Sequence, residues 1–509
     1  MGKTQRTNLI DPSNHIANPL YLVIDQGGHA SRAFVFNKDG QVLAQGNSPI
    51  EAQVNKDANE QVEYDAITLL HSLQHAIHEA VAYPNIQLSD IVSAGMATQR
   101  SNVVCWDRVT GQPLSPIISW QDRRTADWTE QFKPFDKQIH HATGLFLSPH
   151  YGVGKLKWCY ENLPAVAQAH KQQRLCWGPM TSFLLNQLLD EKPYLIDHVN
   201  ASRTLLWNIK THDWDPMLAQ LFGLPSSPLP ECVANQYAFG TLTIGNHKIP
   251  MTTVVGDQSA SLFAWQQLQD DALYINIGTG AFIQRMVNND CIVEPALLTS
   301  LLIKNESDAC YALEGTVNGA GSALSWVEQQ LKPSQLYQQL PQWLEDNNCP
   351  LLFLNGISGL GSPYWQADFK SRFIGDGNDT QKIVAVIESI IYLLQINIEA
   401  LQQQQPAARK ILISGGLTQL DGLCQRIADL SGLTVQRMTA PEATSIGVAW
   451  LLANSNKESL NYNQRNKGSL TQFSPSPNRA LSERYQRWTK ALWEALDKPP
   501  KEKAADLNS

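Results

Sequence analysis

Two segments of this chain repeat one pattern, and that repetition constrains the fold more than any other sequence feature. An apolar run at 21–24 is followed by a Gly-rich polar turn and a second apolar run at 33–36. The same order returns later, with a mostly apolar segment at 273–277, a turn at 278–280 and a segment at 281–286 that begins with three apolar residues. Each segment predicts a strand, a tight turn and a second strand. Two such units in one chain indicate a duplicated domain.

Helical and strand patterns alternate through the rest of the chain. Apolar residues recur with helical spacing at 66–83 and 383–402, and we also expect a last amphipathic helix at 445–452. Short apolar runs at 91–96 and 410–413 predict further buried strands. Strands that alternate with helices predict an α/β fold.

A length of 509 residues exceeds what a single hydrophobic core serves, so two main domains are expected. We predict a disordered tail at 1–18, a first domain at 19–264, a second at 265–455, and a C-terminal tail at 456–509 that contains a helix near 485–496. The Trp-, Pro- and Leu-rich stretch at about 149–250 is interpreted as insertions that cover the first domain.

Charge and composition exclude several classes of function. The net charge is −8 and no long Lys/Arg cluster occurs, which argues against a nucleic-acid partner. We find no apolar run long enough to span a membrane and no apolar signal-peptide core near the N-terminus. The eight cysteines form no C-x-x-C pair. We therefore expect a cytoplasmic protein without membrane or nucleic-acid partners, and a homo-oligomer stays open.

The two Gly-rich turns are candidate phosphate sites. Backbone N–H groups in the turn after Asp25 can approach phosphate oxygens closely, and Asp25 itself could hold Mg²⁺. Gly278 and Thr279 begin the second turn. One such turn alone also fits an ordinary hairpin, whereas the pair favours two phosphate-binding turns. Gly415-Gly416, between a strand and a helix, fits either a nucleotide contact or a plain βα turn.

Asp257 is the candidate base. It stands at the end of a predicted strand at 252–255 and opens a helix of small residues. A carboxylate placed there can accept a proton from a hydroxyl nucleophile, as phosphoryl transfer requires. The pattern fits a helix N-cap equally well, because Asp is among the best capping residues.

Taken together, these residues resemble the FGGY carbohydrate kinases, and glycerol kinases most closely. The matches run in order from about residue 20 to 455 and include Ile24-Asp25-Gln26-Gly27, Thr98-Gln99-Arg100, Trp120-Gln121-Asp122-Arg123-Arg124, Asn200-Ala201-Ser202-Arg203-Thr204, Gly256-Asp257-Gln258, Gly278-Thr279-Gly280-Ala281-Phe282 and Gly359-Leu360-Gly361-Ser362-Pro363.

The resemblance implies two actin-like (ribonuclease H-like) domains with ATP in a cleft between them, Asp257 as the base and Asp25 near Mg²⁺. It implies substrate-binding positions at Arg100, Ser101, Trp120, His150, Asp257, Gln258 and Phe282. It implies nucleotide-binding positions at Gly27, Gly28, His29, Arg32, Gly278, Thr279, Gly321, Ser325, Gly415 and Gly416.

Several positions depart from the glycerol kinase pattern. Ser101 stands where those enzymes carry Glu, His150 where they carry Tyr, and Gly28-His29 where they carry two Thr. Leu420 and Ser325 replace Asn and Gln on the adenine side. An unpaired buried polar group costs roughly 1–3 kcal/mol, so glycerol is not expected to be the preferred substrate.

The leading hypothesis is thus a kinase that transfers the ATP γ-phosphoryl group to a hydroxyl of a small polyol or sugar. A ketopentose kinase of the xylulose or ribulose type is the alternative within the enzymes, kept open by Ser101 and His150. A non-catalytic sensor of nucleotide or sugar is the alternative outside them, motivated by the altered first turn.

Overall fold

The computed structural model describes residues 19–55, 61–266, 268–287, 293–345, 351–404, 406–438, 442–455 and 470–496. They form two compact units. Among these residues, the first unit takes 19–268, 301–310 and 442–455, and the second takes 269–300, 311–438 and 470–496. The predicted tail at 1–18 and most of the predicted tail at 456–509 lie outside the described residues.

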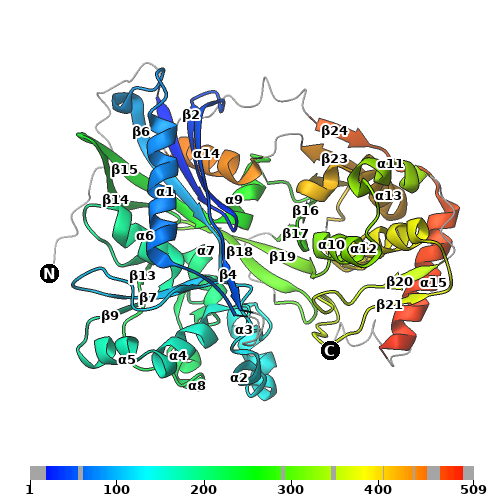
Figure 1. The fold of residues 1–509 in the computed structure, drawn as a ribbon, viewed down its shortest axis with the longest axis horizontal. Coiled ribbons are helices and arrows are strands. Elements are labelled where there is room, and N and C mark those ends of the chain that lie inside the picture. The colour runs from blue at the N-terminus through cyan, green and yellow to red at the C-terminus, as the bar shows by residue number, and fades with distance from the viewer. Residues whose placement is uncertain are drawn as a thin grey trace. The chain divides into compact units, whose positions relative to one another are not determined.

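A six-stranded sheet with the order β14-β15-β6-β1-β2-β3 is the centre of the first unit (Figure 1). β1 pairs antiparallel with β2 and parallel with β6, and β15 continues the parallel part. The strands are β1 (Leu20–Gln26), β2 (Ala30–Asn37), β3 (Val42–Pro49), β6 (Ile91–Thr98), β14 (Gln236–Ile244) and β15 (His247–Gly256).

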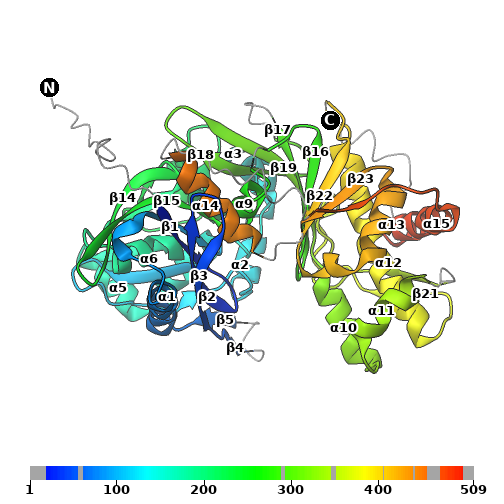
Figure 2. The ribbon, with the colours of Figure 1, turned by 90° about the horizontal axis from the view of Figure 1, so that it is seen from above.

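Successive side chains of β1 point to opposite faces of this sheet, and helices cover both faces. α1 (Ala66–Val81) begins at Asp65, which accepts the Thr68 N–H, and its apolar stripe joins one core cluster with Leu22 and Ile24. On the other face, a Cβ at Gly95 would meet Val448 of α14 (Ala443–Ser455) at 2.8 Å. Figure 2 shows α1 and α14 on opposite sides of β1.

The helix α14 is not amphipathic as expected. Its residues 445–449 and 451–453 are buried around most of the circumference. It packs against β1 and β6 and also against α9 (Asp257–Phe263). A Cβ at Gly447 would overlap the carbonyl oxygen of Ala260, so glycine allows the two helices to approach closely. A helix enclosed by a sheet and a second helix has little solvent-facing surface to make polar.

A second, five-stranded sheet and a helical layer complete the first unit. The sheet has the order β4-β5-β8-β7-β9, with β4 (Gln53–Asn55), β5 (Gln61–Tyr64), β7 (Val103–Asp107), β8 (Ile117–Ile118) and β9 (Leu175–Pro179). The helices are α2 (Ala126–Glu130), α3 (Asp136–Thr143), α4 (Gly152–Asn162), α5 (Pro164–Lys171), α6 (Met180–Leu188), α7 (His198–Ala201) and α8 (Pro216–Leu221). The short strands are β10 (Leu195–Asp197), β11 (Trp207–Asn208), β12 (Asp213–Trp214) and β13 (Glu231–Val233).

The main sheet of the second unit repeats the topology of the first. β16 pairs antiparallel with β17 and parallel with β22, and β23 continues the parallel part. This is the pattern of β1, β2, β6 and β15, so the predicted duplication is confirmed. The strands, in sheet order, are β18 (Leu298–Lys304), β19 (Ala309–Val317), β17 (Ala281–Val287), β16 (Ala272–Ile277), β22 (Lys410–Ser414), β23 (Thr434–Met438) and β24 (Leu470–Phe473).

The helices of this unit pack around α12 (Asp379–Leu401). A capping box formed by Asn378 and Gln381 lies at the start of α12. Contrary to the expectation from the sequence, α12 is long and apolar enough to cross a membrane by length and composition. However, 83% of its most apolar 18-residue stretch is buried inside the protein, as in a core helix. The other elements are α10 (Gly321–Leu331), α11 (Leu336–Glu345), α13 (Asp421–Ser431), α15 (Arg479–Ala495), β20 (Leu352–Leu354) and β21 (Arg372–Ile374). The predicted helix near 485–496 is thus part of α15.

Candidate active site

Asp257 lies at the carboxyl end of the parallel strands of the first sheet. β15 ends at Gly256, which pairs with Thr98 at the end of β6, and Asp25 in β1 pairs with Ala97 of the same strand. Carboxyl ends of parallel strands meet at one edge, where α/β proteins place their ligands. The sheet thus brings together residues that lie far apart in the sequence.

The Asp257 side chain does not cap its helix. Asp257 is the first residue of α9, and Gly256 occupies the N-cap without a side-chain hydrogen bond. The N-cap interpretation of Asp257 is therefore wrong. The backbone N–H of Gln258 donates to Asp257 Oδ1 at 2.8 Å, and 31% of the Asp257 side chain stays exposed.

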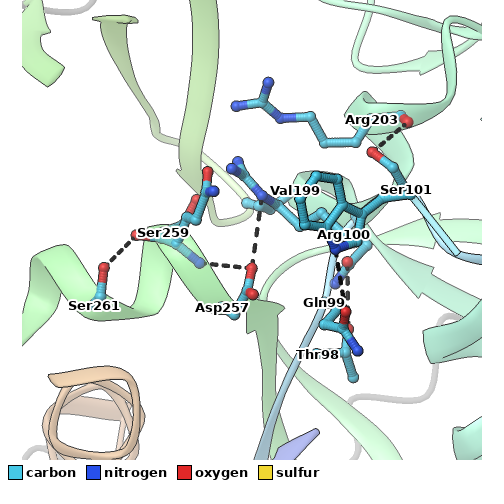
Figure 3. Close-up of polar contacts among 12 residues, drawn as sticks. Thr98, Gln99, Arg100, Ser101, Val199, Arg203, Asp257, Ser259 and Ser261 are labelled. Carbon is cyan, nitrogen blue, oxygen red and sulfur yellow. Dashed lines mark hydrogen bonds and ion pairs between the residues drawn. The ribbon is translucent and has the colours of Figure 1, made fainter. Parts of the chain in front are cut away.

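Arg100 is the cation next to Asp257. Its Nε lies 3.8 Å from Asp257 Oδ1, and its side chain is 7% exposed (Figure 3). A Cβ at Gly256 would meet Cδ of Arg100 at 2.5 Å, so glycine makes room for the aliphatic part of the Arg100 side chain. Burial raises the pKa of Asp257 above its ordinary value, while Arg100, the Gln258 N–H and Arg203 oppose that rise.

Gln99, which lies in the matched segment Thr98-Gln99-Arg100 but was not predicted as a site residue, connects the first Gly-rich turn to Trp120. Its Nε2 donates to the Gly27 carbonyl at 2.8 Å, and its Oε1 accepts from the Trp120 indole at 3.2 Å. The indole ring lies beside the His150 ring, with 5.2 Å between the centroids. Gln99 is 5% exposed, so one buried side chain bonds both the turn and Trp120, the ring beside His150.

Lys155 connects the backbone of His150 to that of Ser101. Lys155 is fully buried, and its Nζ donates to the carbonyls of His150 at 2.6 Å and Ser101 at 3.1 Å. Ser101 Oγ donates to the Arg203 carbonyl at 3.3 Å (Figure 3). Burial, and then Lys155 and Arg123, hold the pKa of His150 well below its ordinary value. The imidazole is therefore neutral at physiological pH.

Asp25 and Arg32 face each other across the first hairpin. They are paired in register between β1 and β2, and Arg32 Nη2 donates to Asp25 Oδ2 at 2.6 Å. Arg32 Nη1 also donates to Glu442 Oε2 at 2.5 Å. Burial outweighs the Arg32 charge and raises the pKa of Asp25 to about 6, with Asp257 and Glu442 contributing. Glu442 was not predicted from the sequence.

The turn between β1 and β2 is a tight hairpin. The Gly27 N–H donates to the Ala30 carbonyl at 3.1 Å, and the Tyr64 hydroxyl donates to the Gly28 carbonyl at 3.0 Å. A Cβ at Gly28 would lie 3.3 Å from Gln99 Oε1. His29 is exposed at the tip. The turn is therefore held on one side by Tyr64 and Gln99, and its tip at His29 faces solvent.

The second unit holds the other Gly-rich turn against the start of α10. Gly278 and Thr279 are exposed, and their carbonyls accept the N–H groups of Gly321 at 3.0 Å and Ser322 at 3.0 Å. A Cβ at Gly321 would approach the Gly278 carbonyl to 2.6 Å. Ser325 is exposed one turn further along α10. Four predicted nucleotide positions thus lie at one end of this unit.

Gly415 and Gly416 play different structural roles. Gly415 has a φ of 103°, and a Cβ there would overlap the Ile277 carbonyl oxygen at the end of β16. Gly416 is exposed, and a Cβ added to it would meet no heavy atom within 4 Å. Leu420 precedes α13, and Phe282 lies on β17 opposite Asn276. These residues belong to the second unit, whereas Arg100, Trp120 and Asp257 belong to the first.

Comparisons with known proteins agree with this architecture. Residues 20–264 match the N-terminal domain of the FGGY family of carbohydrate kinases, and residues 273–455 match its C-terminal domain. A glycerol kinase from Ectopseudomonas mendocina is 31% identical over 441 residues, which cover 84% of this chain and 89% of that protein.

Solved structures share the fold. The Plasmodium falciparum glycerol kinase with ADP superimposes with a TM-score of 0.84 at 24% identity, covering 94% of this chain and 98% of that one. The ligand-bound xylulose kinase from Lactobacillus acidophilus superimposes with a TM-score of 0.79 at 18% identity, covering 94% and 98%. With both family domains matched in order, this chain belongs to the FGGY family of carbohydrate kinases, enzymes that transfer a phosphoryl group from ATP to a hydroxyl of a small sugar or polyol.

Proposed function

We propose that this kinase phosphorylates a terminal hydroxyl of a small polyol or sugar, with the Asp257 carboxylate accepting the hydroxyl proton. The observation that carries the proposal is the combination of orientation and access at Asp257. Gln258 N–H and Arg100 hold the carboxylate, yet 31% of the side chain is exposed. A general base must be fixed in direction and reachable by the substrate. As the substrate oxygen forms its bond to the γ-phosphorus and the bond to ADP breaks, its proton passes to Asp257.

Residues around Asp257 supply both apolar and polar surface for such a substrate. The Trp120 indole, fixed by Gln99, offers a flat face for the carbon chain. Gln258 Oε1 is buried and has no hydrogen-bond partner among the described residues. A buried acceptor without a partner costs free energy that a substrate hydroxyl would recover. Gln258 and Arg100 are thus proposed to bind hydroxyl groups.

We further propose that each Gly-rich turn provides nucleotide-binding groups within its own unit. In the first unit, Gly27, Gly28 and His29 present backbone groups, and Arg32 supplies a charge for phosphate oxygens. In the second unit, Gly278, Thr279, Gly321, Ser325, Gly415 and Gly416 carry this role.

Asp25 is the proposed Mg²⁺ ligand. Mg²⁺ in kinases is commonly bound by one or two carboxylates together with substrate phosphates and water, so a single buried carboxylate beside the phosphate turn fits this need. Within the described residues, no group of three or more His, Cys, Asp or Glu side chains forms a metal site. When bound, Mg²⁺ would neutralise charge on the phosphates. We place the reaction in the cytoplasm, where ATP is the available donor.

Ser101 and His150 favour a second candidate substrate class, the ketopentoses. A serine hydroxyl and a neutral imidazole both donate and accept hydrogen bonds. The carboxylate of the Glu that glycerol kinases carry at the Ser101 position only accepts them. Together they suit a substrate with a carbonyl among its hydroxyls better than they suit glycerol. Glycerol is therefore not the preferred substrate in this proposal.

The test is ADP release by the purified protein over a panel of polyols and ketoses with Mg-ATP. One compound is expected to drive ADP release, and Asp257→Asn is expected to abolish it. Asp127→Asn is the matched control, because Asp127 is an exposed acid on α2. If no compound drives ADP release while ATP still raises the melting temperature, the chain binds nucleotide without transferring phosphate to these acceptors.

A further inference from the structure

Lys155 on α4 is a buried amino group that the proposed reaction does not use. Its exposed fraction is 0%, and its Nζ donates to the carbonyls of His150 at 2.6 Å and Ser101 at 3.1 Å. Taking an amino group out of water is costly unless acceptors inside the protein replace the water. An apolar side chain of similar length would fill the same space without that cost. What a lysine adds at this position is therefore the two hydrogen bonds to these carbonyls.

The first carbonyl belongs to a residue in an uncommon backbone conformation. Ser101 has a φ of 67°, and a serine in this left-handed region is held there by its surroundings. Lys155 binds its carbonyl, and its Oγ donates to the Arg203 carbonyl at 3.3 Å. Ser101 directly follows Arg100, whose Nε lies 3.8 Å from Asp257 Oδ1 (Figure 3). The contacts that hold Ser101 therefore also set the direction in which Arg100 leaves the backbone.

The same peptide group is connected to Trp120. The Ser101 carbonyl belongs to the peptide bond that precedes Asn102, and Asn102 Oδ1 accepts the backbone N–H of Trp120 at 2.8 Å. Asn102 is 1% exposed, so this bond is shielded from water. Lys155 thus fixes one end of the short segment that holds the Trp120 backbone.

The second carbonyl belongs to the loop that leads into α4. His150 lies two residues before the helix begins, and its ring is 5.2 Å from the Trp120 ring and 5.0 Å from the Tyr151 ring, measured between centroids. Lys155 bonds back from the helix to this loop residue. One amino group therefore holds the backbone of His150 and, through the peptide before Asn102, that of Trp120.

We propose that Lys155 is a positioning residue which, through the carbonyls of Ser101 and His150, fixes the backbone from which the substrate-binding side chains extend. The inference rests on the proposed function and adds to it a residue that acts without touching the substrate, because Lys155 is fully buried. Its importance for the reaction follows from geometry. A displacement of about 1 Å in groups that position a substrate can cost about 10²-fold in rate.

Lys155→Met tests the inference, because methionine keeps an unbranched stem of similar length and removes the N–H donors. The assay is ADP release with the polyol or ketose that gives the highest kcat/KM in the wild type. The variant is expected to raise KM for this acceptor about 10- to 100-fold and to leave KM for ATP within about twofold. An unchanged KM for the acceptor, or an equal increase in both KM values, would overturn the inference.

Leu156→Ala is the matched control for damage to α4. Leu156 is the next residue of the helix, is 0% exposed and carries no donor for either carbonyl. Its truncation is expected to lower the melting temperature, as large-to-small changes in a core do, and to leave KM for the acceptor within about twofold. If Leu156→Ala raises this KM as much as Lys155→Met does, the effect reports a loosened helix and the inference fails.

Amide hydrogen exchange of the unliganded protein separates this inference from the proposed function. In Lys155→Met, the Trp120 amide is expected to exchange at least about threefold faster than in the wild type, and faster than in Leu156→Ala. If no compound drives ADP release from the wild type, this faster exchange still supports the positioning role while the kinase proposal fails for these acceptors. If the Trp120 amide exchanges at the same rate in Lys155→Met as in either reference protein, the positioning role is refuted, whichever compounds react.

Lys155→Arg replaces the methionine variant if that variant shows no cooperative melting. Arginine keeps N–H donors for the carbonyls, but its side chain is longer and its donors lie in a rigid plane, so it cannot hold both carbonyls where lysine holds them. It is expected to raise KM for the acceptor at least about threefold and to leave KM for ATP within about twofold. Equal changes in the two KM values, or no change in either, would contradict the inference.

Discussion

The Arg32 guanidinium donates to the Glu442 carboxylate at 2.5 Å, although 410 residues separate the two in the sequence. The same guanidinium binds Asp25 at 2.6 Å. Arg32 is proposed to contact ATP phosphates. In this structure its guanidinium is bound by two carboxylates, those of Asp25 and Glu442. We therefore propose that Glu442 competes with the phosphates for Arg32.

Replacing Glu442 with Gln is expected to strengthen ATP binding. The pair is about one-third exposed, with side-chain exposures of 32% and 29%. Pairs of this kind contribute roughly 0.2–1 kcal/mol, so the Kd for ATP is expected to fall about two- to fivefold. Isothermal titration with ATP measures this, and Glu51→Gln, at an exposed acid of the same unit, is the control. A higher Kd in Glu442→Gln would show instead that Glu442 orients Arg32 for the phosphates.

Asp257→Asn is expected to lower kcat by about 10²- to 10⁴-fold, since the amide cannot accept the hydroxyl proton. The Kd for ATP should change little, because the proposed nucleotide-binding positions are other residues. Single-turnover ADP formation and ATP titration on the same samples measure the two quantities. A loss of kcat below about tenfold would remove Asp257 from the role of base.

The paired glycines after β22 allow a structural role and a ligand role to be separated. Gly415→Ala is expected to destabilise the protein by about 1–3 kcal/mol, because its φ of 103° and the Ile277 carbonyl both exclude a methyl group. The methyl group of Gly416→Ala meets no heavy atom within 4 Å, so this variant should fold normally. If nucleotide lies against this turn, Gly416→Ala raises KM for ATP while its melting temperature stays that of the wild type. An unchanged KM would place the nucleotide elsewhere.

Local patterns predicted the strands, their terminal turns and the position of Asp257 well. The apolar runs around residues 21–24 and 273–277 correspond to β1 and β16, and the Gly-rich turns follow each strand. These features depend on neighbours in the sequence, which is why a pattern can reveal them.

Side-chain partners from distant segments could not be predicted. Glu442, Tyr64 and Lys155 reach the site through tertiary packing, and no motif marks their contacts. The sequence pattern of α14 likewise predicts a helix, but it does not predict which sheet the helix packs against. It packs on β6 where Gly95 makes space for Val448, and on α9 where Gly447 makes space for the Ala260 carbonyl, and such complementarity appears only once both surfaces are known.

Asp197 gives the fold a pH-dependent contribution. It is fully buried at the start of α7 and accepts hydrogen bonds from the Asn200 N–H at 3.1 Å, Asn200 Nδ2 at 2.7 Å and Asn235 Nδ2 at 2.9 Å. Burial nevertheless raises its pKa from 3.8 to about 6. The folded state thus holds this proton more tightly than the unfolded state. The resulting stability is present below pH 3.8 and is lost as the pH rises through about 6.

From these two pKa values, the wild type should lose about 2 kcal/mol of unfolding free energy, relative to Asp197→Asn, between about pH 4.5 and 7.5. The variant is expected to be less stable at both pH values by about 1–3 kcal/mol, since its amide faces the Asn200 amide donor. Urea unfolding followed by Trp fluorescence measures both proteins, and subtracting the variant cancels the titration of every other group. If the difference in unfolding free energy is constant within about 0.5 kcal/mol over this range, Asp197 is ionised throughout, and its three donors outweigh its burial.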